Sequence, residues 1–308
     1  MEPKIAFLFP GQASQYVGMG KDLYENSTVA REYFDKACDI LGFDIKKVCF
    51  EGPEENLKQT KITQPAIYIH SSIIANLLKD IKPSMTAGHS LGEYSAVAAA
   101  KSISFEDGLK LVSLRGELMQ MAGEMNKGTM AAIVGLEIIK IEEACKLASD
   151  EGVVQLANFN SKDQIVISGS INAVKKAMQI AKEFGAKIVK ELVVSGAFHS
   201  PLMEPAKEKL NQKLNEIKFN EAEFPIYANV SAKPTKSGEE IKNNLSKQLT
   251  SPVLWLDTIN NMSNDGLEIA IETGPGKVLQ GLVKKINPNL KIFGVDKFID
   301  IENIFKSL

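Results

Sequence analysis

Hydrophobic and polar positions follow two periods along this chain. Short apolar runs, such as residues 5–9, are separated by longer segments in which apolar side chains recur at spacings of three and four. Short apolar runs bounded by turn residues are typical of strands, and the longer spacing is typical of amphipathic helices. Because the two kinds of segment alternate, the pattern predicts an α/β fold.

The predicted elements form three groups along the sequence. In the first group, strands are expected at 5–9 and 81–87, and helices at 28–41, 64–79, 93–100 and 105–123. The second of these helices has Pro65 near its first turn, where a missing N–H group is tolerated. In the last group, strands are expected at 226–230, 267–272 and 290–295, and helices after Ser200, at 239–249, at 252–262 and after the turn 274–276.

The middle group has an order of its own. Strands predicted at 130–134, 153–158, 164–168 and 187–194 are combined with helices at 138–149 and 171–184. This β-α-β-β-α-β order is that of the ferredoxin-like split unit. We therefore expect a small ferredoxin-like domain at 127–196, inserted into a large α/β domain formed by residues 1–126 and 197–308.

Composition and charge narrow the class of protein. The chain has 308 residues, of which 44% are hydrophobic and 24% charged, and a formal net charge of −2. These values fit a soluble globular protein and argue against a nucleic-acid-binding protein, which would need a strongly basic face. Three cysteines without metal-site spacing indicate free thiols in a reducing compartment. Because neither a signal peptide nor a membrane-spanning apolar run is present in the sequence, we expect no membrane association and a cytoplasmic protein.

The segment Gly88-His89-Ser90-Leu91-Gly92 has the spacing of a nucleophile elbow. In an elbow, a serine lies on a sharp turn between a strand and a helix, and the flanking glycines permit a strained backbone. The expected strand before Gly88 and the small-residue helix after Gly92 supply that context. The pattern therefore indicates Ser90 as a nucleophile.

A serine hydroxyl needs an adjacent base, and His199 is the best candidate among three histidines. His89 adjoins the serine, so its side chain should point elsewhere, and His70 lies inside an apolar helix, which is typical of a structural residue. His199 precedes the expected helix cap Ser200, in a loop between a strand and a helix, where catalytic groups are often found. A role for His199 in the capping region without chemistry stays open.

Arg115 is predicted on the apolar face of the helix at 105–123. Its neighbours at spacings of three and four are Leu111, Val112, Leu118 and Met119. An unpaired charge there is expensive, so one interpretation is a side chain whose head reaches solvent or forms a structural ion pair. The other is a buried cation held for a carboxylate, which a guanidinium binds through two hydrogen bonds.

Two further sets of groups complete the candidate site. The loop after the first strand contains Gln12, and loops at the carboxyl ends of parallel strands share one edge of a sheet. The backbone N–H groups of Gln12 and Leu91 are therefore candidates for an oxyanion hole. Gln248 lies at a helix end, where its carbonyl group is available to accept the ring N–H of His199. No acidic residue stands out for that position.

Seven motifs together resemble the malonyl-CoA:acyl-carrier-protein transacylases, over nearly the whole chain. They are GQASQ (11–15), TQPA (63–66), GHSLGEYSA (88–96), RGELMQ (115–120), GAFHSPLM (196–203), QLTSPVLW (248–255) and ETGPGKVLQGL (272–282). The resemblance implies a large hydrolase-like α/β domain interrupted by a ferredoxin-like domain. It also implies that Ser90 is acylated and that His199 is its base. One departure is Ala13, where the family usually has glycine; if that position requires positive φ, alanine carries strain.

The resemblance also implies the reaction and its partners. Malonyl-CoA would acylate Ser90, and holo acyl carrier protein would take the malonyl group, in fatty-acid synthesis, with no metal or redox cofactor. Arg115 would bind the malonyl carboxylate, Gln12 and Leu91 the oxyanion, and the carbonyl of Gln248 would orient His199. In related polyketide acyltransferases a bulky residue at the position of Phe198 accompanies malonyl selectivity. We expect a monomer.

Three other interpretations stay open on the sequence. A serine hydrolase or thioesterase would explain the elbow but not the Gln12 loop, the apolar setting of Arg115 or the missing acid. A malonyl-specific acyltransferase of a polyketide pathway would use the same chemistry. A protein that only docks acyl carrier protein would have no need for Ser90, His199 and Arg115 together.

Overall fold

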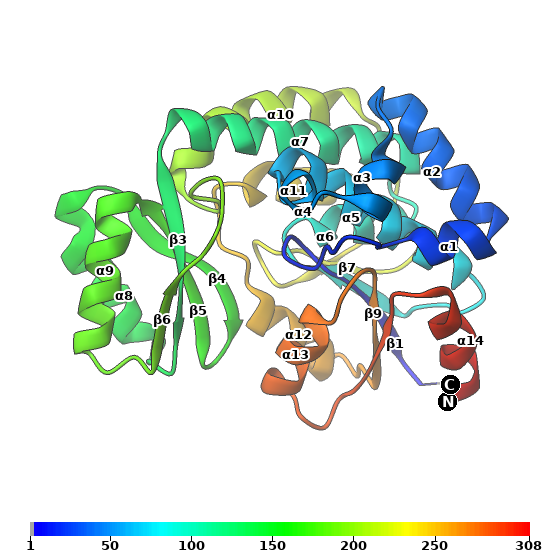
Figure 1. The fold of residues 1–308 in the computed structure, drawn as a ribbon. Helices are drawn as coiled ribbons and strands as arrows, with labels where there is room; N and C mark the ends of the chain where they lie inside the picture. The colour runs from blue at the N-terminus through cyan, green and yellow to red at the C-terminus, as the bar shows by residue number, and fades with distance from the viewer. Residues whose placement is uncertain (1–2) are drawn as a thin grey trace.

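Two sheets organise the computed structural model, which describes residues 3–308 (Figure 1). The larger sheet has the strand order β10-β9-β1-β2-β7-β8, and only the β7–β8 pair is antiparallel. Its strands are β1 (Ile5–Phe9), β2 (Met85–Gly88), β7 (Ile226–Tyr227), β8 (Pro234–Thr235), β9 (Ile269–Thr273) and β10 (Lys291–Val295). The predicted α/β class with a parallel sheet is confirmed.

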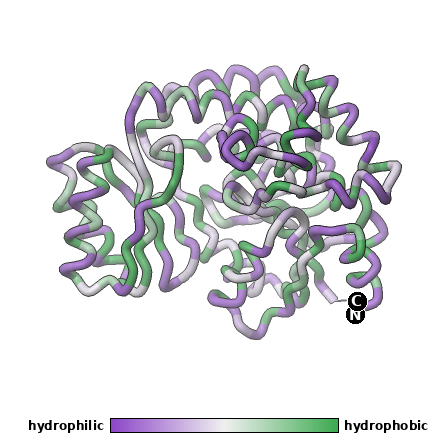
Figure 2. The backbone as a smooth tube through the Cα atoms, viewed as in Figure 1, coloured by the Kyte–Doolittle hydropathy of each residue, from purple (hydrophilic) through white to green (hydrophobic). Residues whose placement is uncertain are grey.

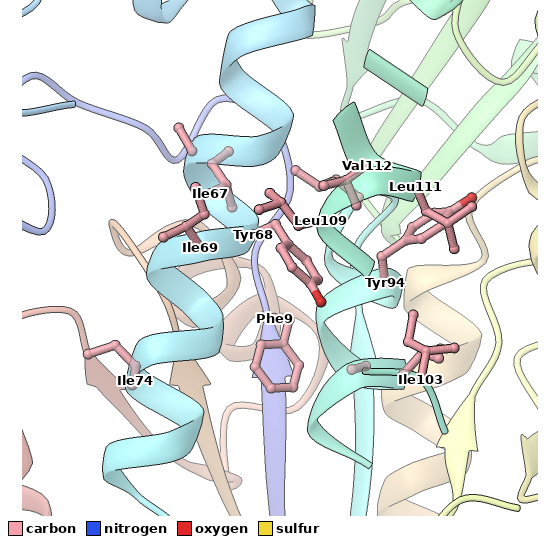
Figure 3. Close-up of a cluster of buried hydrophobic side chains, with 14 of the residues drawn as sticks. Phe9, Ile67, Tyr68, Ile69, Ile74, Tyr94, Ile103, Leu109, Leu111 and Val112 are labelled. Atoms are coloured by element: carbon pink, nitrogen blue, oxygen red, sulfur yellow. The ribbon is translucent and has the colours of Figure 1, made fainter. Parts of the chain in front are cut away.

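The central strand β1 shows why this sheet is buried on both faces. Successive side chains of a strand point to opposite faces. Phe7 and Phe9 enter one hydrophobic cluster, and Ala6 and Leu8 enter another. Figure 3 shows Phe9 with other members of the first cluster, among them Tyr68, Tyr94 and Leu109. A strand that is buried on both faces has apolar residues at consecutive positions. The continuous apolar run at 5–9 therefore predicted this strand from the sequence.

Helices cover both faces of the larger sheet. They are α1 (Lys21–Asn26), α2 (Thr28–Leu41), α3 (Ile45–Glu51), α4 (Glu54–Leu57), α5 (Thr60–Leu77), α6 (Gly92–Ala99), α7 (Phe105–Met125), the 3-10 turn η2 (Pro201–Met203), α10 (Glu204–Glu216), α11 (Gly238–Gln248), α12 (Trp255–Asn264), α13 (Val278–Ile286) and α14 (Phe298–Ser307). Along most of them hydrophobic and hydrophilic residues alternate, as Figure 2 shows. None of the helices between residues 3 and 308 combines the length and apolar character that a membrane crossing requires.

The smaller sheet is antiparallel and lies to one side of the larger one (Figure 1). Its strands are β3 (Gly128–Val134), β4 (Val154–Ser161), β5 (Gln164–Ser170) and β6 (Ile188–Glu191), in the order β4-β5-β3-β6. Helices α8 (Ile138–Ala148) and α9 (Ile171–Glu183), with the 3-10 turn η1 (Ser149–Glu151), complete the predicted β-α-β-β-α-β sequence. This unit has a hydrophobic cluster of its own. The assignment of 127–196 as a separate domain stays a prediction.

Several predicted elements have other bounds in the structure, among them the strands expected at 226–230 and 187–194, which cover only Ile226–Tyr227 and Ile188–Glu191. The strand expected at 81–87 begins only at Met85, because Ile81 still bonds back to Leu78 in a turn and Pro83 has no N–H group to donate. The helix expected at 252–262 begins at Trp255, because Val253 pairs with β4 instead. Pro65 lies inside α5, which starts at Thr60, rather than in its first turn.

Several short elements were not predicted at all. They are α1, α3, α4, the 3-10 turn η1, the two-residue strand β8 and the terminal helix α14. The expected helix after Ser200 begins instead as the turn η2, in which the Ser200 side chain accepts a hydrogen bond from Leu202 N, and continues as α10.

The strand order locates the functional edge of the larger sheet. The chain runs from β1 to β2 on one side of β1, and returns later to place β9 on its other side. Ligands of open α/β sheets bind where the order reverses in this way, at the carboxyl ends of the strands. The loops that follow β1 and β2, which contain Gln12 and Ser90, both lie at that edge.

Candidate active site

Ser90 lies in the turn between β2 and α6, with a φ angle of 52°. The two glycines of the segment permit this turn to pack closely: a Cβ atom on Gly92 would collide with the carbonyl oxygen of Phe9, and one on Gly88 with the backbone of Gly92. The backbone N–H of Ser90 donates to Asn229 Oδ1 at 2.7 Å, and Asn229 Nδ2 donates to the carbonyl of Gly88 at 2.6 Å. Asn229 therefore holds both sides of the elbow.

His199 lies within hydrogen-bond distance of the serine. The distance from Ser90 Oγ to His199 Nε2 is 2.8 Å. On the other side of the ring, Nδ1 is 3.0 Å from the carbonyl oxygen of Gln248 and 3.1 Å from that of Ser251. Since carbonyl oxygens only accept, Nδ1 carries the proton and Nε2 is free to accept the proton of Ser90.

The environment keeps this imidazole neutral. Burial lowers the pKa of His199 to about 3, and the nearby positive charge of Arg115 acts in the same direction, whereas the bonds to Gln248 and Ser251 act weakly against it. A neutral imidazole at neutral pH has the protonation state that a general base needs.

Arg115 is 1% exposed and makes no ion pair among residues 3–308. Its Nη1 donates to Gln64 Oε1 at 2.8 Å, and its Nη2 donates to Gln248 Oε1 at 3.0 Å and to Ser90 Oγ at 3.1 Å. Nε has no hydrogen-bond partner within the described chain. Burial lowers the pKa of Arg115, although a guanidinium stays charged at neutral pH. The interpretation in which the head reaches solvent is wrong.

The loop that contains Gln12 packs against the elbow. A Cβ atom on Gly11 would meet the carbonyl oxygen of His89, and His89 N donates to the carbonyl of Phe9 at 2.9 Å. Between residues 3 and 308, the backbone N–H groups of Gln12 and Leu91 donate to no other group. Ala13 has a φ angle of 81°, so the condition under which alanine carries strain is met.

Gln248 contributes both its backbone and its side chain. Its carbonyl oxygen faces His199, as described above. Its side-chain Nε2 donates to the carbonyl of Ser90 at 2.9 Å and to Glu93 Oε2 at 2.6 Å, while its Oε1 accepts from Arg115. The side chain was not part of the sequence prediction for this residue.

The remaining candidates have these surroundings. Phe198 is 6% exposed and belongs to the main hydrophobic cluster. The ring of His89 points away from the serine, as expected, and its Nε2 lies 2.8 Å from Asn160 Oδ1. His70 is buried in α5, and its Nε2 lies 3.2 Å from Asp296 Oδ1, which fits a structural residue.

The acyl transferase domain family matches residues 6–289. The chain belongs to this family. The malonyl CoA-acyl carrier protein transacylase of Bacillus subtilis (strain 168) is 45% identical over 308 residues, covering 99% of this chain and 97% of the relative. The enzyme of the same description from Staphylococcus aureus (strain MRSA252) is 42% identical over 300 residues, 97% of each chain. The solved structure of the transacylase from Coxiella burnetii is 38% identical, with a TM-score of 0.97, covering 100% of this chain and 98% of that one.

Five residues that contact the candidate site were not predicted from the sequence, and one of them is Gln155, whose Nε2 donates to the carbonyl of His199 at 2.9 Å. The other four, Asn229, Glu93, Gln64 and Ser251, all contact one of the predicted residues directly. Asn229 could have been predicted from the sequence. It is a polar residue just past the carboxyl end of a strand that neighbours the strand before the elbow. Gln64 and Glu93 lie within quoted motifs, but an amide or a carboxylate on an apolar helix gives no indication of its partner.

Proposed function

We propose that this protein transfers the malonyl group of malonyl-CoA to the phosphopantetheine thiol of acyl carrier protein, in fatty-acid synthesis, through a malonyl ester of Ser90. One observation carries the proposal: Ser90 Oγ has both a base and a cation within hydrogen-bond distance, His199 Nε2 at 2.8 Å and Arg115 Nη2 at 3.1 Å. A base beside a serine activates it for acyl transfer, and a buried cation beside the same atom selects an acyl group that carries an anion.

In the first half-reaction, Ser90 Oγ attacks the thioester carbonyl of malonyl-CoA while His199 Nε2 takes its proton. The tetrahedral oxyanion accepts hydrogen bonds from the N–H groups of Gln12 and Leu91, which have no other partner in the described chain. The carbon–sulfur bond then breaks, and His199 returns the proton to the CoA thiolate. The product is malonyl-Ser90 with a neutral His199.

The second half-reaction repeats these steps with another nucleophile. The phosphopantetheine thiol of acyl carrier protein gives its proton to His199 and attacks the malonyl ester. The ester carbon–oxygen bond breaks, Ser90 takes the proton back from His199, and malonyl-acyl carrier protein leaves. The bond from Nδ1 to the carbonyl of Gln248 keeps His199 in the tautomer that both half-reactions need.

Arg115 would bind the malonyl carboxylate. Acetyl-CoA has no carboxylate, so it would leave a fully buried guanidinium without its anion. A site built to bind a polar group rejects an analogue that lacks it by a large factor, on the order of a hundredfold or more.

Phe198 would restrict the space beside the malonyl carbon. It precedes His199 in the chain and its side chain is almost completely buried. Phe198→Ser should therefore raise the rate of methylmalonyl transfer relative to malonyl transfer, measured by competition between the two CoA esters. If the ratio of products does not change, the aromatic ring only fills the core.

The proposal also includes the division of the chain into domains and the cellular compartment of the protein. The unit at 127–196 would be a separate small domain, because its sheet and hydrophobic cluster are its own, and 1–126 with 197–308 would form the large domain. We assign the activity to the cytoplasm, as the sequence indicated.

The decisive experiment is intact-mass measurement after incubation with malonyl-CoA alone, with Ser90→Ala as the control. We expect a stable malonyl adduct that is absent from the control and is removed by holo acyl carrier protein. Accumulation of free malonate without carrier protein would identify a hydrolase instead. If no adduct and no turnover are found, the transferase proposal fails.

A further inference from the structure

Glu93 is a buried carboxylate in the helix that follows the elbow. It is 2% exposed, and its Oε2 accepts from Gln248 Nε2 at 2.6 Å and from the backbone N–H of Asn229 at 3.3 Å. Burial raises the pKa of Glu93 to about 7. A buried acid with a raised pKa is costly to maintain, and the reaction steps above do not use it. Among the predicted site residues, Glu93 contacts Gln248, through its side-chain amide.

The side-chain amide of Gln248 has two possible orientations, and the donors and acceptors around it favour one of them. In the orientation of the structure, the NH₂ group faces three acceptors: Glu93 Oε2 at 2.6 Å, the carbonyl of Ser90 at 2.9 Å and Asn229 Oδ1 at 3.4 Å. The amide oxygen then faces Arg115 Nη2 at 3.0 Å. A flipped amide would place its oxygen against the acceptors and its NH₂ group against the guanidinium, so the observed orientation is the one its partners require.

The orientation of this amide determines what Arg115 can contact. With Gln248 Oε1 on Nη2 and Gln64 Oε1 on Nη1, both terminal nitrogens of the guanidinium are held by neutral acceptors. Nη2 is thereby kept 3.1 Å from Ser90 Oγ, where the acyl group would be attached. Two neutral acceptors hold the guanidinium in position without an ion-pair contact, which leaves it able to pair with an incoming carboxylate.

We propose that Glu93 is a positioning residue for substrate selection: its carboxylate oxygen fixes the amide orientation of Gln248, and Gln248 in turn holds Arg115 for the malonyl carboxylate. This inference rests on the proposed function, in which Arg115 binds that carboxylate. It requires an acceptor at position 93 and does not require a full negative charge there, because Oε2 makes both bonds.

The test compares a variant that removes the acceptor with one that keeps it. Glu93→Leu preserves the volume but removes the acceptor, whereas Glu93→Gln can place its amide oxygen where Oε2 now lies. For each, kcat and KM are measured with malonyl-CoA and acetyl-CoA as acyl donors to holo acyl carrier protein. Thermal unfolding is measured in parallel.

We expect Glu93→Leu to raise KM for malonyl-CoA and to lower the malonyl-to-acetyl ratio of kcat/KM, each by about tenfold, because a misplaced Arg115 weakens carboxylate binding. Glu93→Gln should keep the ratio within about threefold of the wild-type value. Glu272→Leu is the matched control, because Glu272 is also fully buried but, within residues 3–308, bonds only to Leu279 and Gln280. It should lower the unfolding temperature without changing the ratio.

A double-mutant cycle tests whether the effect passes through the Gln248 side chain. Gln248→Leu keeps the backbone carbonyl that faces His199 and should lower the ratio by itself. In that background, Glu93→Leu should cause no further loss of selectivity. If Glu93→Leu does not fold, Gln248→Leu alone still tests the proposal, since an unchanged ratio in that variant overturns it.

Other results also overturn the proposal. They are an unchanged ratio in Glu93→Leu, equal losses in Glu93→Gln and Glu93→Leu, or independent losses in the double-mutant cycle. Failure of the proposed function gives a different result. If Arg115 does not bind the malonyl carboxylate, Arg115→Ala itself keeps the malonyl preference. If Arg115→Ala lowers the malonyl-to-acetyl ratio of kcat/KM and Glu93→Leu does not, only the role of Glu93 is rejected.

Discussion

Three residues at the site have positive φ angles without being glycine: Ala13 with 81°, Ser90 with 52° and His199 with 57°. A residue with a Cβ atom in this conformation is strained by roughly 1–2 kcal/mol. Such strain collects at functional sites, where the surrounding structure enforces it. At Ser90 and His199 the strained backbone brings Oγ and Nε2 to within 2.8 Å of each other. Ala13 lies in the loop that contains Gln12 and contributes no reacting atom.

We expect Ala13→Gly to stabilise the protein by about 0.5–1 kcal/mol, because glycine removes the strain and gives back only part of that gain through a freer unfolded chain. For a chain of this size the unfolding temperature should rise by about 1–3 °C. Ala75→Gly, in the last turn of α5, is the control for an ordinary helical position and should destabilise by up to about 1 kcal/mol. A lower unfolding temperature in Ala13→Gly would contradict the argument.

Arg115→Ala should lose malonyl transfer and tolerate acetyl-CoA better. The substitution removes a buried cation whose Nη2 lies 3.1 Å from Ser90 Oγ. It also removes the penalty for an acyl group that has no anion, so the malonyl-to-acetyl ratio of kcat/KM should fall by about a hundredfold. The measurement is acyl transfer from each CoA ester to holo acyl carrier protein. An unchanged malonyl preference would exclude Arg115 from carboxylate binding.

At the scale of elements, β4 joins the smaller sheet to the site. Val253 N donates to the carbonyl of Ala157 at 2.9 Å, and Phe159 N donates to the carbonyl of Val253 at 2.9 Å. From the same strand, Gln155 Nε2 donates to the backbone carbonyl of His199 at 2.9 Å. The strained peptide that presents His199 is therefore held by a strand of the other unit.

Gln155→Leu should lower kcat by about tenfold. The backbone carbonyl of His199 loses its hydrogen bond, and the imidazole ring is then no longer held in a fixed position. The free energy of unfolding should fall by about 1–3 kcal/mol in denaturant unfolding, the penalty for a buried carbonyl group without a hydrogen bond. Gln179→Leu is a matched control, since Gln179 lies on α9 of the same unit and its side chain bonds, in the part of the chain that the structure describes, only to the exposed Glu183. Equal kcat values in the two variants would show that the link has no role in positioning His199.

Elements with strong local signals were predicted well from the sequence, and those defined by long-range contacts were not. The elbow, β1 and the β-α-β-β-α-β unit each follow from spacing and periodicity. The strand-like path of Val253 could not be predicted, because it depends on β4, roughly a hundred residues earlier in the chain. The side-chain partners of Gln248 belong to the same class, since they come from three separate elements.

At the scale of the whole molecule, the site contains buried ionisable groups with opposed pKa shifts. The pKa of His199 is lowered to about 3 and that of Glu93 is raised to about 7, both mainly by burial. Each shift makes the free energy of unfolding depend on pH. Between the pKa of a group in the folded chain and its pKa in the unfolded chain, the two states bind different numbers of protons. The signs of the two contributions differ.

Below about pH 6.5 the unfolded chain protonates its histidine while folded His199 stays neutral, so stability is lost as the pH falls toward 3. Between about pH 4.5 and 7 the unfolded chain has already lost the glutamate proton that folded Glu93 retains, so stability is lost as the pH rises through that window.

These signs predict how two variants change the pH profile of unfolding. Relative to the wild-type protein, His199→Gln should gain stability progressively as the pH falls from 6.5 to 4, because it removes the group that must stay unprotonated. Glu93→Gln should gain relative stability as the pH rises from 4.5 to 7, because it removes the group that must give up its proton in a buried setting. The measurement is the free energy of unfolding in denaturant at several pH values, taken as a difference from wild type so that other titrating groups cancel. Difference curves that are flat, or that slope in the opposite directions, would show that burial does not shift the pKa values of His199 and Glu93 in these directions.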